Sequence, residues 1–354
     1  MFNFVLKCLY VLQGHLHFIR NFAKSNLDVP IFTKIKFFIL GFLPAVYFLY
    51  DFSKFDKSLY LTDREKLTKK VLIDFNVHKL LIDKRVFSDL IESHVNVPYI
   101  YGYFTKGTIS EHNGSGINSI GSLISKIKEL SGFPVVIKPN RKSRGTGVFM
   151  LSFSKESGFI RNNEDITEEQ LLSLLSTLDD FIAVEYLKQG EYSNRIFSET
   201  CNTIRFWMMI DPDTNKPFIA RAFHRFGCNQ SRPVDNGARG GIITALDLKT
   251  GKAQRSIVRS SRRYIDILQH PDSKADLSKL VIPNWDKVKK AVIELSERFN
   301  YIPYIGWDVV VSDDGSITII EGNSNSDPYA AQLIEPLLID SQIKRYYQYH
   351  KVIK

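Results

Sequence analysis

The chain has 354 residues, 24% of them charged and 44% hydrophobic, which is ordinary for a globular protein with room for two or three subdomains. Lys and Arg outnumber Asp and Glu by 47 to 38, and residues 1–70 hold 11 of the basic residues against 5 acidic ones. The three cysteines and eight histidines show neither an even disulfide framework nor a metal-ligand spacing, which argues against zinc chemistry and predicts reduced thiols in a cytosolic protein.

Residues 1–75 are predicted to form a basic, aromatic-rich helical region. Its longest uncharged run, residues 37–50, has Gly41 and Pro44 within it and is too short and too broken to span a bilayer. Residues 1–16 lack an Ala-x-Ala cleavage pattern, which argues against a secretory signal. Two interpretations stay open: the region binds the face of an anionic membrane, or it is a helical cap on the core with solvated lysines. Nucleic acid is disfavoured because the aliphatic content is high and no recognition motif is present.

A capping box, in which Thr62 is followed three residues later by Glu65, opens a helix predicted to run to about Phe75. A polar loop is expected at 107–118 and a helical segment at the C-terminus. The other predicted helices lie at about 84–94, 119–131, 167–178, 258–269 and 285–299, and the predicted strands at 98–104, 133–138, 148–153, 181–186, 203–210, 217–225 and 242–247. This order predicts an α+β fold with a small lid over a larger catalytic platform, and lacks the regular βαβ alternation of a doubly wound fold.

The loop between the strands at 133–138 and 148–153 is basic and contains glycines. Its glycines let backbone N–H groups approach a polyphosphate, and its cations supply charge. It is neither a Walker A loop nor a dinucleotide fingerprint, because no helix follows and Met150 occupies the third glycine position. On its own, such a loop also fits a solvated hairpin. The residues concerned are Lys138, Arg141, Lys142, Arg144, Gly145 and Gly147.

Near the C-terminus, two apolar runs flank an Asp-Gly pair at 314–315, which predicts a hairpin with a two-residue turn. In that register Glu321 faces Asp308, and Asn323 lies on the same sheet face opposite Gly306. Two carboxylates and an amide oxygen are the hard ligands that suit Mg²⁺ carrying phosphates. The alternative is a surface hairpin with solvated acids.

These motifs, in this order, resemble the ATP-grasp superfamily, and most of all its sugar-transfer-associated branch, over about residues 35–340. The resemblance implies an ATP-grasp fold in which a small lid subdomain covers a larger, mainly antiparallel sheet, with a helical region at the N-terminus. The predicted domains are the N-terminal region 1–75, the N-terminal part of the core 76–130, the lid 131–187, and the catalytic subdomain 188–354.

By the same resemblance, ATP contacts fall on Lys84, Lys138, Arg144, Gly145, Gly147 and the hinge residues Glu185, Tyr186 and Leu187, while Mg²⁺ falls on Asp308, Glu321 and Asn323. Residues specific to the branch are candidates for substrate binding: Asn202, Asp235, Asn236, Gly240 and Gly241. Related ligases often have an arginine where this chain has Gly306. The cation that steadies the transferring group must then come from elsewhere, with Arg205 as first choice, followed by Arg221 and Arg225.

The resemblance implies an ATP- and Mg²⁺-dependent carboxylate–amine ligase acting through an acyl phosphate. Its expected product is an amide between a sugar of the uronic acid type, free or lipid-linked, and an amino acid or amine, in the synthesis of a surface polysaccharide such as capsule or O-antigen. The expected location is cytoplasmic, peripheral at the inner face of the membrane. Two alternatives stay open, a kinase on the same scaffold acting on a sugar, and a non-catalytic partner of a glycosyltransferase, which the intact motifs disfavour.

Overall fold

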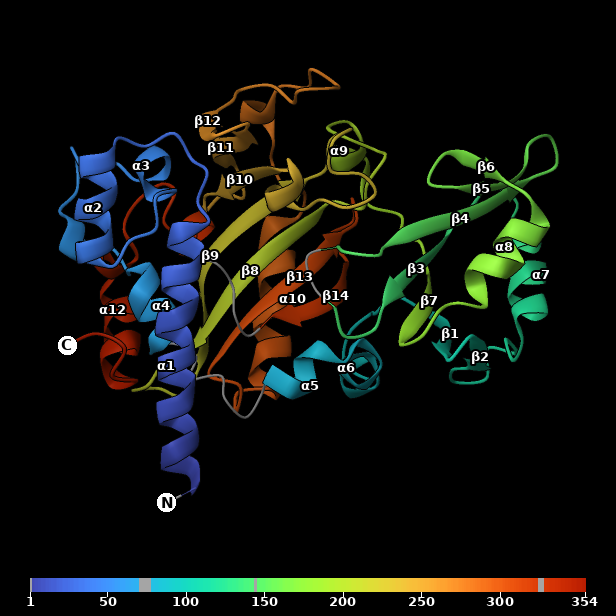
Figure 1. The fold of residues 1–354 in the computed structure, drawn as a ribbon, viewed down its shortest axis with the longest axis horizontal. Helices are drawn as coiled ribbons and strands as arrows, with labels where there is room; N and C mark the ends of the chain where they lie inside the picture. The colour runs from blue at the N-terminus through green and yellow to red at the C-terminus, as the bar shows by residue number, and fades with distance from the viewer. Residues whose placement is uncertain (1, 70–77, 143–144, 324–327) are drawn as a thin grey trace.

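The computed structural model describes residues 2–69, 78–142, 145–323 and 328–354. Two seven-stranded antiparallel sheets dominate it. Figure 1 shows them side by side, one made of the teal and green strands at the right and the other of the yellow to red strands in the centre. We call the first the lid sheet and the second the platform sheet.

The lid sheet contains β1 (Ile100–Thr105), β2 (Thr108–Glu111), β3 (Val135–Pro139), β4 (Phe149–Ser154), β5 (Gly158–Arg161), β6 (Glu164–Ile166) and β7 (Phe181–Glu185). The platform sheet contains β8 (Thr203–Ile210), β9 (Pro217–Phe226), β10 (Ile242–Leu246), β11 (Ala253–Ser260), β12 (Arg263–Asp266), β13 (Tyr304–Val311) and β14 (Ile317–Asn323). The helices are α1 (Phe2–Ala23), α2 (Ile31–Leu40), α3 (Val46–Leu49), α4 (Asp63–Thr68), α5 (His78–Ile82), α6 (Lys84–Ile91), α7 (Ile120–Leu130), α8 (Glu168–Leu175), α9 (Glu191–Asn194), α10 (Trp285–Arg298), α11 (Pro328–Ala331) and α12 (Ser341–Tyr349).

The lid sheet has the strand order β2-β1-β7-β3-β4-β5-β6, and α7 and α8 cover one of its faces (Figure 1). Both helices begin at capping boxes, with Ser119 and Thr167 as the N-caps, because these side chains accept hydrogen bonds from the third residue of each helix. Ile127 of α7 and Leu171 of α8 share one apolar core with Ile137 of β3. The lid is therefore a two-layer unit with a core of its own.

The platform sheet has the strand order β12-β11-β10-β9-β8-β13-β14. Its central strands β8 and β13 are buried along their whole length, because α10 covers one face while α12 and the N-terminal helices cover the other. Because successive side chains of a strand point to opposite faces, β8 and β13 contribute to two separate cores. Trp307 packs with Val292 on the side of α10, whereas Trp207 and Tyr304 pack with Tyr346 on the side of α12.

The N-terminal helices are anchored on the platform sheet. Phe37 and Phe42 share a buried cluster with Ile257 of β11. The amide of Gln332 accepts a hydrogen bond from Leu61 N at 2.8 Å and donates one to Leu61 O at 3.1 Å. The buried cluster and these two hydrogen bonds attach α2 and the segment after it to the platform.

The structure confirms several predicted elements, and α7, α8 and α10 lie close to their expected ranges. The capping box that opens α4 is present, since Thr62 Oγ1 accepts from Glu65 N at 3.1 Å and Glu65 Oε2 accepts from Thr62 N at 3.0 Å. Helix α4 ends at Thr68, and the rest of the predicted helix, residues 70–75, lies outside the described residues.

The helix predicted at 258–269 is wrong, because this segment contains the end of β11 and all of β12. The two strands are joined through Ser261, whose φ of +52° belongs to a turn and not to a helix. Pairing of β11 with β10 buries Ile257. The segment therefore follows the two-residue alternation of a β-strand and not the periodicity of a helix. The polar loop predicted at 107–118 contains β2, and the sequence reading also missed β5 and β6.

Candidate functional site

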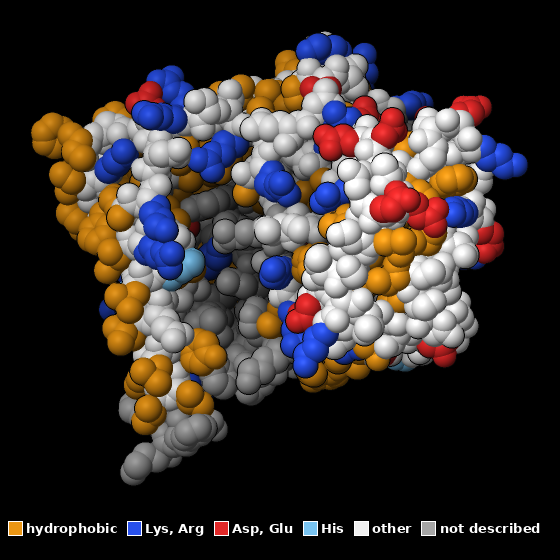
Figure 2. Space-filling view, turned by 45° about the vertical axis from the view of Figure 1, so that its right-hand side comes forward, with side chains coloured by type: hydrophobic (Ala, Val, Ile, Leu, Met, Phe, Trp, Pro, Cys, Tyr) orange, Lys and Arg blue, Asp and Glu red, His pale blue; other side chains and the backbone are white. Residues whose placement is uncertain are grey.

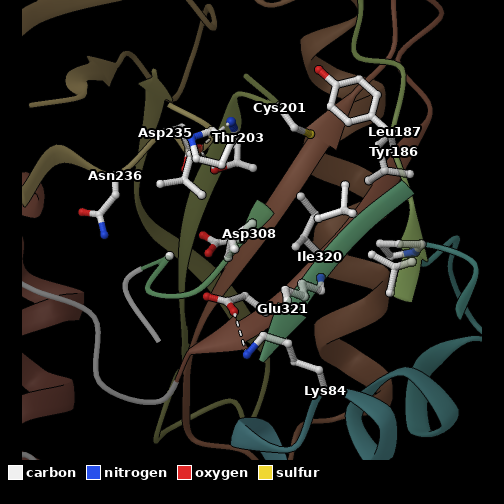
Figure 3. Close-up of a pocket in the computed structure, with 18 of the residues that line it drawn as sticks. Lys84, Tyr186, Leu187, Cys201, Thr203, Asp235, Asn236, Asp308, Ile320 and Glu321 are labelled. Carbon is white, nitrogen blue, oxygen red and sulfur yellow. Dashed lines mark hydrogen bonds and ion pairs between the residues drawn. The ribbon is translucent and has the colours of Figure 1, made fainter. Parts of the chain in front are cut away.

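A cavity of about 190 Å³ lies between the two sheets. Its walls come from β3, β4, β7 and the loop after β3 on the lid side, and from β8, β9, β13, β14 and the loop at 233–236 on the platform side. Figure 3 shows Ile320, Tyr186 and Leu187 on one side of this space and Asp308 and Glu321 on another. The cavity therefore has an apolar part and a charged part.

The apolar part is a slot between the sheets. Val136 and Val184, which are paired across β3 and β7, line it together with Met150 from the lid and Ile320 from the platform. The hinge segment 185–187, which begins at the last residue of β7 and leads from the lid to the platform, lines the same cavity. Apolar walls that approach from two sides suit a flat heterocyclic ring.

Two lysines stand in the charged part. Lys84, the first residue of α6, donates from Nζ to the backbone oxygens of Asn140 at 3.1 Å and Lys142 at 2.9 Å. Its Nζ also lies 3.9 Å from Glu321 Oε2, the ion pair drawn as a dashed line in Figure 3. Burial and the positive charge of Lys84 lower the pKa of Lys138 to about 8. An anionic ligand placed here would relieve the repulsion between the two lysines.

The pairing predicted for the C-terminal hairpin is confirmed, since Asp308 pairs with Glu321 and Gly306 pairs with Asn323. The predicted two-residue turn is wrong, because residues 313–315 form a three-residue turn between paired neighbours. A longer turn by itself would shift every pair by one position and move Glu321 away from Asp308.

A β-bulge in β14 restores the register. Val309 pairs with Ile319, but Asp308 pairs with Glu321, so Ile320 is the extra residue of the longer strand. Because of the bulge, Ile320 and Glu321 both line the cavity, although neighbours in a regular strand point to opposite faces. The apolar slot and the acidic group thus meet at this bulge.

Three side chains with oxygen atoms converge beside the bulge. Asn323 Nδ2 donates to Asp308 Oδ2 at 3.2 Å and to Glu321 Oε1 at 3.1 Å. A half-turn of the amide would place its oxygen, instead of its nitrogen, between the two carboxylates. The two carboxylates and the amide converge on one place. Their oxygens form a set of ligands that fits a hard divalent cation.

Asp308 is buried and held by two arginines. Arg205, its partner on β8, donates to both carboxylate oxygens, with Nη2 2.8 Å from Oδ2. Arg225 Nη2 lies 3.0 Å from the same Oδ2. Burial by itself would raise the pKa of Asp308, but Arg205 and Arg225 outweigh it and lower this pKa to about 2. Asp308 therefore stays ionised inside the fold.

Replacing Arg205 with leucine is expected to lower the free energy of unfolding by about 3 kcal/mol, because the buried carboxylate of Asp308 loses its two-point partner. Denaturant-induced unfolding measures the change. The matched control is Arg345→Gln, which removes an exposed ion pair with Asp213 and should change the free energy of unfolding far less. Equal losses in the two variants would contradict the role given to Arg205.

The three candidate arginines occupy different places. Arg225 lines the cavity, and its Nε lies 3.0 Å from Thr203 Oγ1 and 3.4 Å from Asp235 Oδ2. Although burial opposes its charge, Asp235 and Asp308 raise the pKa of Arg225. Arg205 lies behind Asp308 and does not line the cavity. Of the three, Arg225 is the one positioned to contact a bound group.

Arg221 lies outside the cavity. Its Nη2 donates to Glu335 Oε1 at 3.2 Å, and its Nη1 lies 3.9 Å from Asp340 Oδ2. Both acids belong to the segment that leads into α12. These contacts assign Arg221 to the packing of the C-terminal segment on β9.

Most of the residues predicted from the sequence come together in the cavity, and a smaller group does not. Those that line it are Lys84, Lys138, Gly145, Glu185, Tyr186, Leu187, Arg225, Asp235, Asn236, Asp308 and Glu321. Gly147 lies beside the lining with a φ of +79°, where an added Cβ would come 3.1 Å from the Pro139 ring. Arg144 lies outside the described residues.

Asn202, Gly240 and Gly241 do not line the cavity. Asn202 donates to Ser193 Oγ and Phe197 O, and its Oδ1 accepts from Thr200 Oγ1 and Gly227 N, so its amide is fully used within the fold. Gly240 has a φ of +101° at the end of the short turn 237–239, a conformation that favours glycine. Gly241 lies so near the backbone of Asn236 that an added Cβ would approach it within 2.9 Å.

The sequence reading missed several lining residues, among them Cys201, Thr203, Val234 and Ile320. Thr203 Oγ1 donates to Asp235 Oδ2 at 2.5 Å, and Asp235 is a buried acid whose pKa burial raises. All four are direct neighbours in the chain of candidate site residues: Cys201 and Thr203 of Asn202, Val234 of Asp235, and Ile320 of Glu321. Cys201 and Val234 carry no chemical signal of their own.

Comparison with known proteins decides the family. The family model described as "Sugar-transfer associated ATP-grasp" matches residues 64–341. The chain belongs to this family. The match begins after the N-terminal helices, so residues 35–63, included in the predicted resemblance, lie outside it. The two-sheet architecture with a cavity between the sheets is accordingly an ATP-grasp fold.

Similar solved structures belong to ATP-grasp ligases. They include VanG D-Ala:D-Ser ligase from Enterococcus faecalis (11% identity, 76% of this chain and 61% of that chain, TM-score 0.41) and D-alanine–D-alanine ligase from Bacillus anthracis (14%, 77% and 69%, 0.36). The ADP complex of the N5-carboxyaminoimidazole ribonucleotide synthetase purK shows 11% identity over 71% of this chain and 46% of its own length, with a TM-score of 0.37. The chain thus spans about half of that synthetase. A search of curated proteins gave no match.

Proposed function

We propose that this ATP-grasp protein is an ATP- and Mg²⁺-dependent carboxylate–amine ligase. The observation that carries the proposal is the cavity itself, in which an apolar slot, one lysine from the lid and one from α6, and an acidic group from the platform face one space. A nucleotide with a flat base, a polyphosphate and a bound cation matches these three parts in that order.

The lid and helix α6, which packs on the platform, supply the contacts for phosphates. Lys84 and Lys138 stand at the charged part of the cavity, and the described part of the lid loop adds Lys142 and Gly145. This loop is held against the platform, because Arg239 Nη1 donates to Gly145 O at 3.0 Å. Bound phosphates would therefore lie between cations held by the lid and by the platform.

The acidic group fits Mg²⁺. Glu321 and Asn323 would hold the ion together with Asp308, once the Asn323 amide turns its oxygen towards the carboxylates. A magnesium ion bound there supplies charge neutralisation to phosphate oxygens. The buried arginines lower the pKa of Asp308 to about 2, so its carboxylate is charged at neutral pH.

The reaction needs positioning and charge more than acid–base groups. An oxygen of the substrate carboxylate attacks the γ-phosphorus of ATP, and the bond from that phosphorus to the bridging oxygen breaks, which yields an acyl phosphate and ADP. An amine nitrogen then attacks the acyl carbon, phosphate leaves, and the nitrogen loses a proton to give an amide. Arg225 would steady the charge on the transferring group from its place at the cavity wall.

For substrates we propose a sugar carboxylate of the uronic acid type, free or lipid-linked, and an amino acid or amine, as in the assembly of a surface polysaccharide. The family description supports a sugar. Thr203, Asp235 and Asn236 lie on the platform side of the cavity, where hydroxyl, carboxylate and amide groups can bind sugar hydroxyls.

Release of ADP and free phosphate in the presence of candidate uronic acids and hydroxylamine tests the proposal. A ligase forms a hydroxamate in step with ADP, because hydroxylamine takes the place of the amine. A phosphorylated sugar formed without free phosphate would overturn the proposal in favour of a sugar kinase on the same scaffold.

ATP affinity is expected to fall about tenfold between pH 7 and pH 9, because the pKa of Lys138 is about 8 and only its protonated form attracts phosphate. Lys138→Arg should remove this dependence, since arginine stays charged throughout the range. Calorimetric titration with ATP and Mg²⁺ at both pH values measures it. An unchanged pH dependence in the arginine variant would contradict the assignment.

The same shift predicts how protein stability changes with pH. The unfolded chain binds a proton at Lys138 more readily than the folded protein between pH 8 and the ordinary lysine pKa of 10.5. This lysine therefore costs stability below pH 8, and the cost disappears as the pH rises through that range.

A further inference from the structure

The N-terminal helices use only one side for packing on the rest of the molecule. On α1, Gly14 lies against the backbone of Leu67, where an added Cβ would approach the carbonyl oxygen within 2.1 Å. Four residues further on, Phe18 is buried and stacks on Phe38 of α2 with ring centroids 5.7 Å apart. Helix α1 is thus fixed through the face that carries Gly14 and Phe18.

The opposite face of α1 is apolar and exposed. Its residues follow the alternating spacing of four and three that keeps side chains on one stripe of a helix, half a turn away from Gly14. The exposed stripe consists of Val5, Leu9, Leu12, Leu16 and Ile19. Among the described residues, no helix is long and apolar enough to cross a bilayer.

Helix α2 adds a second exposed apolar face. Phe32 is 83% exposed and Ile39 is 69% exposed, while Phe37 on the other side of the helix is buried. Lys34 and Lys36 flank the exposed face on either side of the helix axis. Figure 2 shows the hydrophobic side chains of α2 and α1 gathered along the left of one face, with Lys and Arg side chains beside them. We call this surface the N-terminal apolar face.

The charge around the N-terminal apolar face is positive. Residues 1–50 contain five Lys and Arg residues and a single acid, Asp28. That acid is already engaged, because Arg263 Nη2 donates to Asp28 Oδ2 at 2.6 Å. An exposed apolar surface with basic residues around it complements a layer that is apolar inside and anionic at its surface.

We propose that the N-terminal apolar face docks on the surface of an anionic lipid bilayer, with α1 and α2 lying in the interface and the lysines meeting lipid phosphates. A second copy of this chain fits less well, because pairing two such faces brings like charges together. The proposal does not depend on the ligase activity, since none of these residues lines the cavity.

Co-sedimentation of the full chain with vesicles tests the docking. We expect binding to vesicles of phosphatidylcholine mixed with phosphatidylserine, and at least about tenfold weaker binding to phosphatidylcholine alone. High salt should weaken the binding to the mixed vesicles. Absent binding, or equal binding to both kinds of vesicle, would overturn the proposal.

Two variants locate the contact. Phe32→Ser combined with Ile39→Ser should reduce binding to mixed vesicles at least about tenfold, and Lys34→Gln combined with Lys36→Gln about tenfold. Both pairs leave the buried face of α2 intact, so the unfolding midpoint should not change.

Matched controls lie on helices that are not part of the N-terminal apolar face. Leu172→Ser removes a 42% exposed leucine from α8 of the lid, and Lys126→Gln with Lys290→Gln removes the same two charges from α7 and α10. These controls should bind like the unaltered protein. Loss of binding in them, or a dimer that the α2 variants convert into a monomer, would overturn the proposal.

Discussion

Replacing Glu321 with glutamine should lower Mg²⁺-dependent ATP turnover by about a hundredfold or more. The substitution keeps the shape of the side chain and its hydrogen bond to Asn323 but removes the negative charge that would face the cation. Phosphate release measured over a series of Mg²⁺ concentrations shows both the lower rate and the higher Mg²⁺ requirement.

The fold should survive this change, because Glu321 is only partly buried and its ion pair with Lys84 is long, at 3.9 Å. Glu294→Gln, on the exposed surface of α10, is the matched control and should behave like the unaltered protein. Normal turnover and a normal Mg²⁺ requirement in the Glu321 variant would remove the basis for the metal site.

Replacing Arg225 with lysine should lower the turnover rate about a hundredfold while changing ATP affinity only a few-fold. Lysine keeps one positive charge near Asp308 and Asp235, so the fold is retained, but it cannot reproduce the planar donors that reach both acids and the cavity. Turnover from phosphate release and affinity from calorimetry separate the two effects.

Arg221→Gln provides the control for this prediction. Arg221 lies four residues earlier on β9 and pairs with Glu335 outside the cavity, so its loss should leave turnover unchanged. Similar losses of turnover in the Arg221 and Arg225 variants would contradict the assignment of Arg225.

In the C-terminal hairpin, the sequence predicted the correct strand pairing but neither the correct turn length nor the bulge. The Asp-Gly pair correctly indicated a turn, and the apolar runs on either side indicated two strands. The turn has three residues instead of two, which by itself would misplace Glu321, and the bulge at Ile320 compensates for that difference. The position of a bulge depends on packing across the sheet, so the local sequence does not predict it.

Some of the missed strands did carry a local signal. Strands β5 and β6 are joined by Asn162 and Asn163, both with positive φ, which is the two-residue hairpin turn that asparagine favours. Lys106 and Gly107 join β1 and β2 in the same way. These short hairpins were predictable from turn chemistry.

Other features depend on tertiary structure alone. Arg205, Arg221 and Arg225 look alike in the sequence. In the structure, Arg205 pairs with Asp308, Arg221 pairs with the C-terminal segment, and Arg225 lines the cavity. Asn202 likewise has a side-chain amide that could bind a substrate, but the amide makes all of its hydrogen bonds within the protein. The partners that decide these outcomes lie up to 114 residues away along the chain.

The most direct test of the account is a crystal structure of the protein with a non-hydrolysable ATP analogue and Mn²⁺ in place of Mg²⁺. We predict an anomalous manganese peak bound by Asp308, Glu321 and Asn323. The phosphates should lie beside Lys84 and Lys138, and the adenine in the slot lined by Val136, Val184 and Ile320. Nucleotide or manganese bound elsewhere, with this cavity empty, would contradict the account.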